Sequence, residues 1–152
     1  MPKLPQSTPD LVVGSLRIWI HGYQFPDAAD DWDSNWIRLT ASYVSAGGAA
    51  TISGSILDTV SFGAFTAELL ELHRSLAGEA TLSSVEPNFY LQLSASNSHG
   101  GIAGRLLLSS DHLSEEHSFT FEYDQSYIPA LLEQLRSITD AYPVRGKRSR
   151  RV

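Results

Sequence analysis

The sequence predicts an α+β domain built on a mostly antiparallel sheet, with the element order β-β-β-α-β-β-β-β-α. Three observations lead to this prediction. Seven short stretches have the composition or the apolar–polar alternation of strands. Two other stretches repeat apolar residues at helical spacing. Short turn-forming segments join most of the strands, so neighbouring strands should run antiparallel while the two helices pack on the sheet.

Three strands are expected before the first helix. The first covers residues 16–21, where Leu and Ile alternate with Arg17, Trp19 and His21. Residues 36–44 repeat this alternation, and the Gly47-Gly48 pair makes a tight turn into a third strand over residues 50–57. The pattern indicates consecutive antiparallel strands, each with one buried face.

The first helix follows Asp58. Its apolar residues fall largely at helical spacing, and Gly78 is expected to end it. The residues that define the apolar stripe are Phe62, Phe65, Leu69, Leu70, Leu72 and Leu76.

Four further strands and a second helix complete the domain. The strands are expected over residues 81–85, 88–94, 101–109 and 118–123. Ser126 is the expected cap of the last helix, and Pro129 is tolerated in its first turn. The helix presents an apolar stripe made of Ile128, Leu131, Leu132, Leu135 and Ile138.

The chain of 152 residues suits a single domain with a self-sufficient core. Residues 1–10 carry three prolines without apolar periodicity and are expected to be a disordered leader. Residues 11–144 form the expected domain. Residues 145–152 hold five Lys or Arg residues and are expected to be a basic flexible tail. A solvated tail is favoured over one that contacts RNA or folds back on the acidic domain.

The charge distribution restricts the class of partner. Residues 1–144 carry 17 acidic and 6 basic residues, a formal charge of −11. Such a field repels nucleic acid and attracts basic proteins, although it also serves solubility alone in many proteins. The chain has no cysteine and no apolar run long enough for a membrane helix. We therefore expect a cytoplasmic protein with a protein partner, with no nucleic acid or membrane bound; the oligomeric state is not indicated.

The sequence does not indicate an enzyme. It lacks the nucleophile elbow, the phosphate-binding loop, the dinucleotide fingerprint and the zinc protease motif. His112 and His117 lie near Glu115 and Glu116, but this segment joins two expected strands, where polar residues are simply solvated. No catalytic residue, cofactor or metal ligand is predicted.

One segment combines carboxylates with aromatic residues. Between the first two strands, residues 22–36 hold four aspartates beside two tryptophans and a tyrosine. Carboxylates are poor core material, whereas Trp and Tyr are common anchors in protein interfaces. We predict that partner binding uses Tyr23, Asp27, Asp30, Asp31, Trp32, Asp33 and Trp36.

Two alternatives stay open for this segment. Asp31, Asp33 and Asn35 match the start of a calcium-binding EF-hand loop, but Trp36 replaces the required glycine and Ser42 the final glutamate. The chain could then be a non-enzymatic interaction module that binds calcium. In the second alternative the aromatic side chains pack inward and the aspartates only solvate a turn.

The residues also resemble a known family. Gly22-Tyr23-Gln24-Phe25-Pro26, the aspartate run and Trp32-Asp33-Ser34-Asn35-Trp36 are similar to the WapI-like bacterial immunity proteins, as are Glu86-Pro87-Asn88 and Tyr142-Pro143-Val144-Arg145. The resemblance covers roughly residues 16–145, whereas the leader and the Arg-rich tail lie outside it. It implies a cytoplasmic antidote, without catalytic activity, that blocks a polymorphic toxin; in the best-known member the toxin is a nuclease that attacks tRNA.

The charge pattern and the resemblance lead to one hypothesis. A nuclease must present Lys and Arg to phosphates, so an inhibitor can cover that surface with carboxylates. Asp27, Asp30, Asp31 and Asp33 would imitate the phosphate charges while Tyr23, Trp32 and Trp36 act as anchors.

Overall fold

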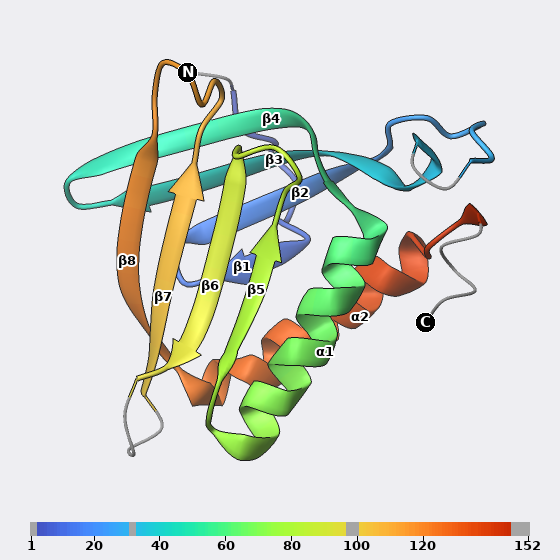
Figure 1. Cartoon of the computed structure of the whole chain (residues 1–152). Helices are drawn as coiled ribbons and strands as arrows, with labels where there is room; N and C mark the ends of the chain where they lie inside the picture. The colour runs from blue at the N-terminus through green and yellow to red at the C-terminus, as the bar shows by residue number, and fades with distance from the viewer. Residues whose placement is uncertain (1–2, 31–32, 97–100, 147–152) are drawn as a thin grey trace.

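The computed structural model describes residues 3–30, 33–96 and 101–146. It confirms the α+β class, the antiparallel pairing and the expected order of the main elements. The strands form two four-stranded sheets (Figure 1). The first sheet contains β1 (Leu11–Val13), β2 (Leu16–Tyr23), β3 (Trp36–Ser45) and β4 (Gly48–Asp58). The second contains β5 (Glu79–Ser83), β6 (Phe89–Ala95), β7 (Gly101–Leu108) and β8 (His117–Asp124).

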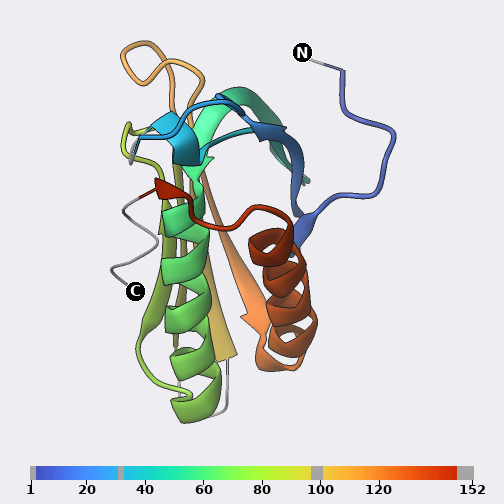
Figure 2. The ribbon, with the colours of Figure 1, turned by 90° about the vertical axis from the view of Figure 1, so that its right-hand side faces the viewer.

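The two helices lie side by side, next to the edge strand β5 of the second sheet (Figure 1). Helix α1 (Thr59–Ser75) connects the sheets and runs along the edge strand β5, while α2 (Ile128–Ala141) packs against α1 and β1 (Figures 1 and 2). Two single turns of 3-10 helix, η1 (Asp33–Asn35) and η2 (Gln125–Tyr127), precede β3 and α2. In the part of the chain described, neither α-helix has the length and apolarity needed to cross a bilayer.

The strand β1 is an addition to the predicted order. It has three residues and pairs with β2 through a turn at Gly14, whose φ of 60° favours glycine. A strand this short has no alternation long enough to recognise in the sequence. The division into two sheets was also not predicted, because alternation indicates strands but not which of them pair.

The C-terminal end of α1 and the start of α2 differ from the sequence prediction, whereas α1 begins after Asp58 as expected. Asp58 caps α1 by accepting a hydrogen bond from the Ser61 amide at 2.8 Å. The residue that ends α1 in the left-handed conformation is Leu76, with φ 53°, and not Gly78. At α2, Ser126 does not provide the cap; it lies inside η2, which Asp124 caps by accepting from the Ser126 amide.

One hydrophobic core joins both sheets and both helices. An aromatic cluster connects the sheets, with Phe119 of β8 stacked on Tyr43 of β3 at 4.4 Å between ring centroids. Phe121 lies across from Gly104, where an added Cβ would be 2.3 Å from the ring. Gly104 is therefore required by this close approach, because any side chain would displace Phe121.

The segment before β1 is attached to the first sheet. The Ser7 carbonyl accepts a hydrogen bond from the Trp19 indole at 2.8 Å, and the Asp10 carboxylate accepts one from the Ile20 amide at 2.7 Å. Trp19, which alternation places on the polar face of β2, is only 4% exposed. Ser7 and Asp10 lie within residues 1–10, for which the disordered leader stays a prediction.

Candidate partner-binding loop

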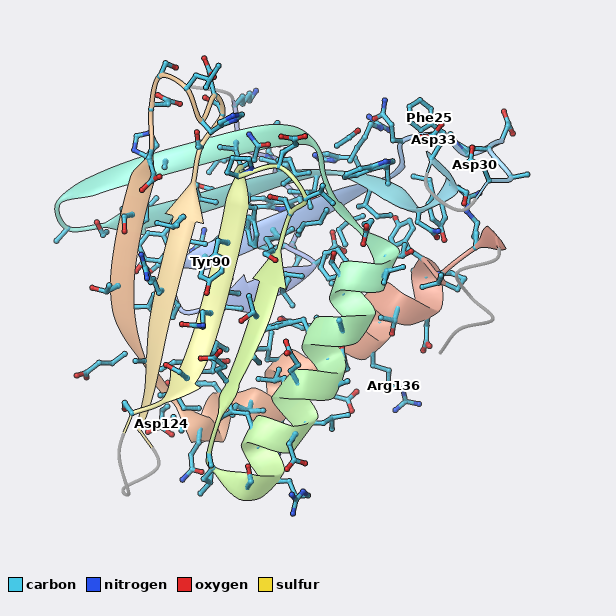
Figure 3. All side chains as sticks on the ribbon, in the orientation of Figure 1. Phe25, Asp30, Asp33, Tyr90, Asp124 and Arg136 are labelled. Atoms are coloured by element: carbon cyan, nitrogen blue, oxygen red, sulfur yellow. The ribbon has the colours of Figure 1, made fainter. Side chains whose placement is uncertain are left out.

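The segment singled out in the sequence forms a projecting loop. We define the acidic loop as residues 24–35, which join β2 to β3 and end in η1. The loop extends beyond the strands at one end of the first sheet, on the side of the molecule where α2 ends (Figures 1 and 2). Figure 3 shows the side chains of Phe25, Asp30 and Asp33 gathered at this projection.

The predicted binding residues fall into three groups. Asp27, Asp30 and Asp33 are exposed on the acidic loop. Tyr23 ends β2 and Trp36 begins β3; both are half-buried. Phe25, which was not included in the prediction, is 45% exposed beside them. The two remaining predicted residues, Asp31 and Trp32, lie outside the described residues.

Local hydrogen bonds shape the acidic loop. The Asp30 carboxylate accepts from the Asp33 amide at 2.6 Å, and the Ser34 hydroxyl donates to the Asp30 carbonyl. These are the turn contacts that Asp and Ser favour. At the base, the Gln24 amide donates to the Trp36 carbonyl at 2.8 Å and closes the loop.

A second set of contacts comes from the end of the chain. The Arg145 guanidinium donates to the carbonyls of Phe25 (3.1 Å) and Pro26 (2.8 Å) on the outgoing side of the acidic loop. Its Nε donates to the Ser34 carbonyl on the returning side at 2.8 Å. One side chain thus bridges both sides of the loop. The residue is the first of the expected flexible tail, residues 145–152, of which 147–152 lie outside the described residues.

Asn35 is the buried centre of this arrangement. Its amide exchanges two hydrogen bonds with the Arg145 backbone, accepting from N at 2.7 Å and donating to O at 3.0 Å. The same Oδ1 accepts from the Thr59 hydroxyl at 2.9 Å. Asn35 is fully buried, so these bonds satisfy polar atoms that water cannot reach. They connect the end of the acidic loop to the start of α1.

Tyr23 lies between the acidic loop and the end of the chain. Its hydroxyl donates to the Pro143 carbonyl at 2.6 Å, and its ring meets Tyr142 edge-on at 5.5 Å. The Arg145 guanidinium carbon lies 3.7 Å from the ring centroid, a cation–π contact. Burial raises the pKa of the Tyr23 phenol, and the Arg145 charge only partly opposes this effect. Tyr23 therefore supports the loop through both its hydroxyl and its ring, and its role in partner binding stays a prediction.

Two carboxylates of the acidic loop, Asp27 and Asp33, are exposed. Within residues 3–30, 33–96 and 101–146, neither Asp27 nor Asp33 makes a salt bridge. Arg145 lies nearby, but its hydrogen bonds go to carbonyl oxygens. In the same described residues no three His, Asp or Glu side chains gather as a metal site would require. Asp31, which the calcium alternative needs, lies outside them.

A second acidic loop provides a contrast. The β7–β8 loop (residues 109–116) holds Asp111, Glu115 and Glu116. The Asp111 carboxylate accepts from the Leu113 amide and the Ser114 hydroxyl, which hold its pKa below the usual range. The Ser110 hydroxyl similarly lowers the pKa of Glu115, which lies 3.7 Å from His117. The Asp111 and Glu115 carboxylates of this loop thus accept hydrogen bonds from within the loop itself.

Three residues that support the acidic loop were not predicted from the sequence: Asn35, Pro143 and Arg145. All three belong to the motifs that carry the family resemblance. That resemblance was the available signal, but it did not indicate that the segments meet, because about 110 residues separate Asn35 from Arg145.

A known protein family matches most of the chain. The model of the immunity protein WapI-like family matches residues 12–143, most of the chain. The matched range includes the whole acidic loop and ends two residues before Arg145. A search of curated proteins finds no match.

Proposed function

The chain belongs to the WapI-like family of immunity proteins, and on this basis we propose that it binds and neutralises a cognate polymorphic toxin. The family is generally non-enzymatic, so the proposed action is binding without catalysis. In this proposal the toxin is a nuclease domain with a basic surface, and the two proteins meet in the cytoplasm. The acidic loop is the proposed contact surface.

The single observation that carries the choice of surface is the state of the loop aspartates. Asp27, Asp30 and Asp33 are exposed on a loop whose backbone is held on both sides. Asp27 and Asp33 also make no salt bridge within the described residues, and an exposed carboxylate of this kind loses little hydration free energy when it meets a cation. Holding several such groups on a fixed backbone lowers the entropy cost of ordering the loop on binding.

The mechanism follows from the charges that a nuclease needs. A nuclease that cleaves RNA attracts phosphates with Lys and Arg, and an acidic loop placed over those residues excludes the substrate. Exposed apolar surface at Phe25 and the half-buried Trp36 would contact the toxin beside the charges. The net charge of residues 1–144 would accelerate the encounter at low salt.

A charge-neutral loop tests the surface directly. We expect Asp27→Asn, Asp30→Asn, Asp31→Asn and Asp33→Asn together to slow association with the toxin domain about tenfold at low salt and to flatten its salt dependence. Asn keeps an oxygen that can accept the Asp33 amide, so the loop conformation should persist. Stopped-flow or surface-based kinetics at several salt concentrations measures both effects.

The matched control removes the same number of charges elsewhere. Glu86→Gln, Asp111→Asn, Glu115→Gln and Glu116→Gln change the net charge equally, on and beside the β7–β8 loop. This variant should slow association by less than about threefold, through the long-range field alone. Equal slowing by both variants would show that the acidic loop is not the contact surface.

Co-expression tests the immunity function as such. The C-terminal domain of the toxin encoded by the neighbouring gene should kill a host cell, and this chain should rescue it. Failure to rescue, with both proteins present and folded, would reject the proposed pairing. Trp36 is a poor choice for this test, because a half-buried residue at the start of β3 contributes to stability as well as to any interface.

A further inference from the structure

We infer that Arg145 is a positioning residue, which holds the acidic loop in its binding conformation from the end of the chain. This inference rests on the proposed function, because it concerns the same surface. It adds a residue that lies outside the predicted binding segment and that acts through the loop rather than by touching the toxin.

The geometry distinguishes Arg145 from an ordinary surface charge. Its guanidinium donates to carbonyls on both sides of the acidic loop, at Phe25 and Pro26 and at Ser34. Three acceptors in different directions suit the planar fork of Arg and do not suit the single ammonium of Lys. The face of the guanidinium lies on the Tyr23 ring, 3.7 Å from its centroid.

The backbone around Arg145 is fixed independently of its side chain. Asn35 pairs with the Arg145 backbone through two hydrogen bonds, and the Tyr23 hydroxyl holds Pro143. The guanidinium is therefore delivered to the loop from an anchored main chain. Because the Arg145 backbone is already held, ordering the Arg145 side chain costs little conformational entropy. More of the free energy of its hydrogen bonds therefore stabilises the loop.

A charge role and a positioning role of Arg145 predict opposite effects on toxin binding when Arg145 is removed. If Arg145 acted only as a charge, removing it would make the protein more acidic and would speed association with a basic toxin. If Arg145 positions the loop, removing it weakens binding despite the more favourable charge. The two roles therefore predict opposite directions of change in affinity.

The experiment compares three variants of the full chain. Arg145→Gln removes the fork and the charge, Arg145→Lys keeps the charge, and Arg136→Gln is the matched control. Arg136 is exposed on α2, and Figure 3 shows its side chain extending away from the acidic loop. Hydrogen exchange reports on the loop through the amides of Gln24, Ala28 and Asp33, each of which donates a hydrogen bond. Amides of β6 and β7 report on the rest of the fold, and affinity is measured with the purified toxin domain.

We expect both Arg145 variants to exchange the loop amides at least about tenfold faster while the β6 and β7 amides keep their rates. Affinity should fall about five- to tenfold for both, through loss of preorganisation. Arg136→Gln should leave loop exchange unchanged and should not weaken binding.

Two results would overturn the inference. The first is an unchanged rate of loop amide exchange in Arg145→Gln, which would show that Arg145 does not hold the loop. Wild-type loop exchange and affinity in Arg145→Lys would likewise show that Arg145 acts only through its charge. The second is faster loop exchange with unchanged affinity, which would show that loop order does not matter for binding. If the four-aspartate variant also binds normally, the proposed contact surface fails as well, so the two failures can be told apart.

Discussion

The acidic loop and the β7–β8 loop both carry several carboxylates, but different parts of the chain hold them in place. The β7–β8 loop is fixed mainly by itself: its internal side-chain contacts, such as Asp111 to Leu113 and Ser109 to Glu115, span two to six residues. The acidic loop has local turns of this kind too, but its two sides are bridged by Arg145, 111 residues or more away.

The two loops differ in how they use their carboxylates. A loop made of local turns keeps its shape by using its carboxylates, as Asp111 does when it accepts from Leu113 and Ser114. The acidic loop is bridged through its carbonyl groups, so the charges of Asp27 and Asp33 are not consumed in holding the shape. A surface that must offer charge to a partner gains from being held by other groups.

The largest expected effect comes from removing the centre of the long-range contacts. Asn35→Ala leaves the buried Thr59 hydroxyl and the Arg145 amide without their acceptor, and should lower the free energy of unfolding by about 3 kcal/mol. Asn88 lies before β6 and contacts the β7–β8 loop. Asn88→Ala removes one hydrogen bond to Ser109 at a half-buried site and should lower the free energy of unfolding by only about 1 kcal/mol. Urea denaturation of both variants measures the difference. Equal losses would show that the two loops depend on their asparagines to the same degree.

A smaller effect is expected at Tyr23. Tyr23→Phe removes the 2.6 Å hydrogen bond to Pro143 but keeps the ring beneath Arg145, so it should lower stability by about 1 kcal/mol. Tyr23→Leu also removes the cation–π contact and should speed amide exchange in the acidic loop further than Phe does. If the Phe variant alone loosens the loop as much as Leu, the ring contact with Arg145 contributes nothing.

Acid should loosen the β7–β8 loop before it breaks the Arg145 bridge of the acidic loop. The folded pKa values of Asp111 and Glu115 lie below their ordinary values of about 3.9 and 4.3. Their contribution to stability is therefore present above these ordinary values and is lost as the pH falls through the lower, folded values. The acceptors of the Arg145 bridge are backbone carbonyls, not carboxyl groups. Side-chain and amide NMR between pH 5 and 2 should show the β7–β8 loop changing while the Arg145 bridge persists; the reverse order would contradict this account.

The smallest effect is expected at the most exposed apolar residue of the second region. Leu113 is 86% exposed, so Leu113→Ser should change the free energy of unfolding by less than about 0.5 kcal/mol. It should also leave toxin affinity unchanged, whereas Phe25→Ser beside the acidic aspartates should weaken it. Thermal denaturation and binding of the two variants make this comparison. A clear loss of affinity in Leu113→Ser would place part of the interface on the β7–β8 loop.

Local patterns predicted most of the elements. Alternation located β2, β3 and β4, and helical spacing located α1 and α2, because each pattern is set within a few neighbouring residues. The helix ends were less well predicted: Leu76 takes the left-handed conformation assigned to Gly78, and Asp124 caps a turn where Ser126 was expected to begin the helix. At such ends several residues compete for the same position, and tertiary packing decides among them.

The sequence predicted where the acidic loop lies, and the binding role of the loop stays a prediction. The acidic, aromatic character of residues 22–36 is a property of composition, and Asp27, Asp30 and Asp33 are exposed as expected. The support of the loop was not predicted. Arg145 stands at the start of a basic run and reads as one more solvated charge, and Asn35 reads as a turn residue.

The sequence by itself determined the strands, the helices, the strongly acidic body and the position of a charged loop between two strands. Each of these depends on residue types and their spacing along a short stretch of chain. The tertiary structure alone decided that the strands divide into two sheets, that Phe121 requires Gly104, and that Arg145 bridges the acidic loop. The reason is that hydrogen bonds and close packing between residues far apart in the sequence exist only once the core has brought those segments together.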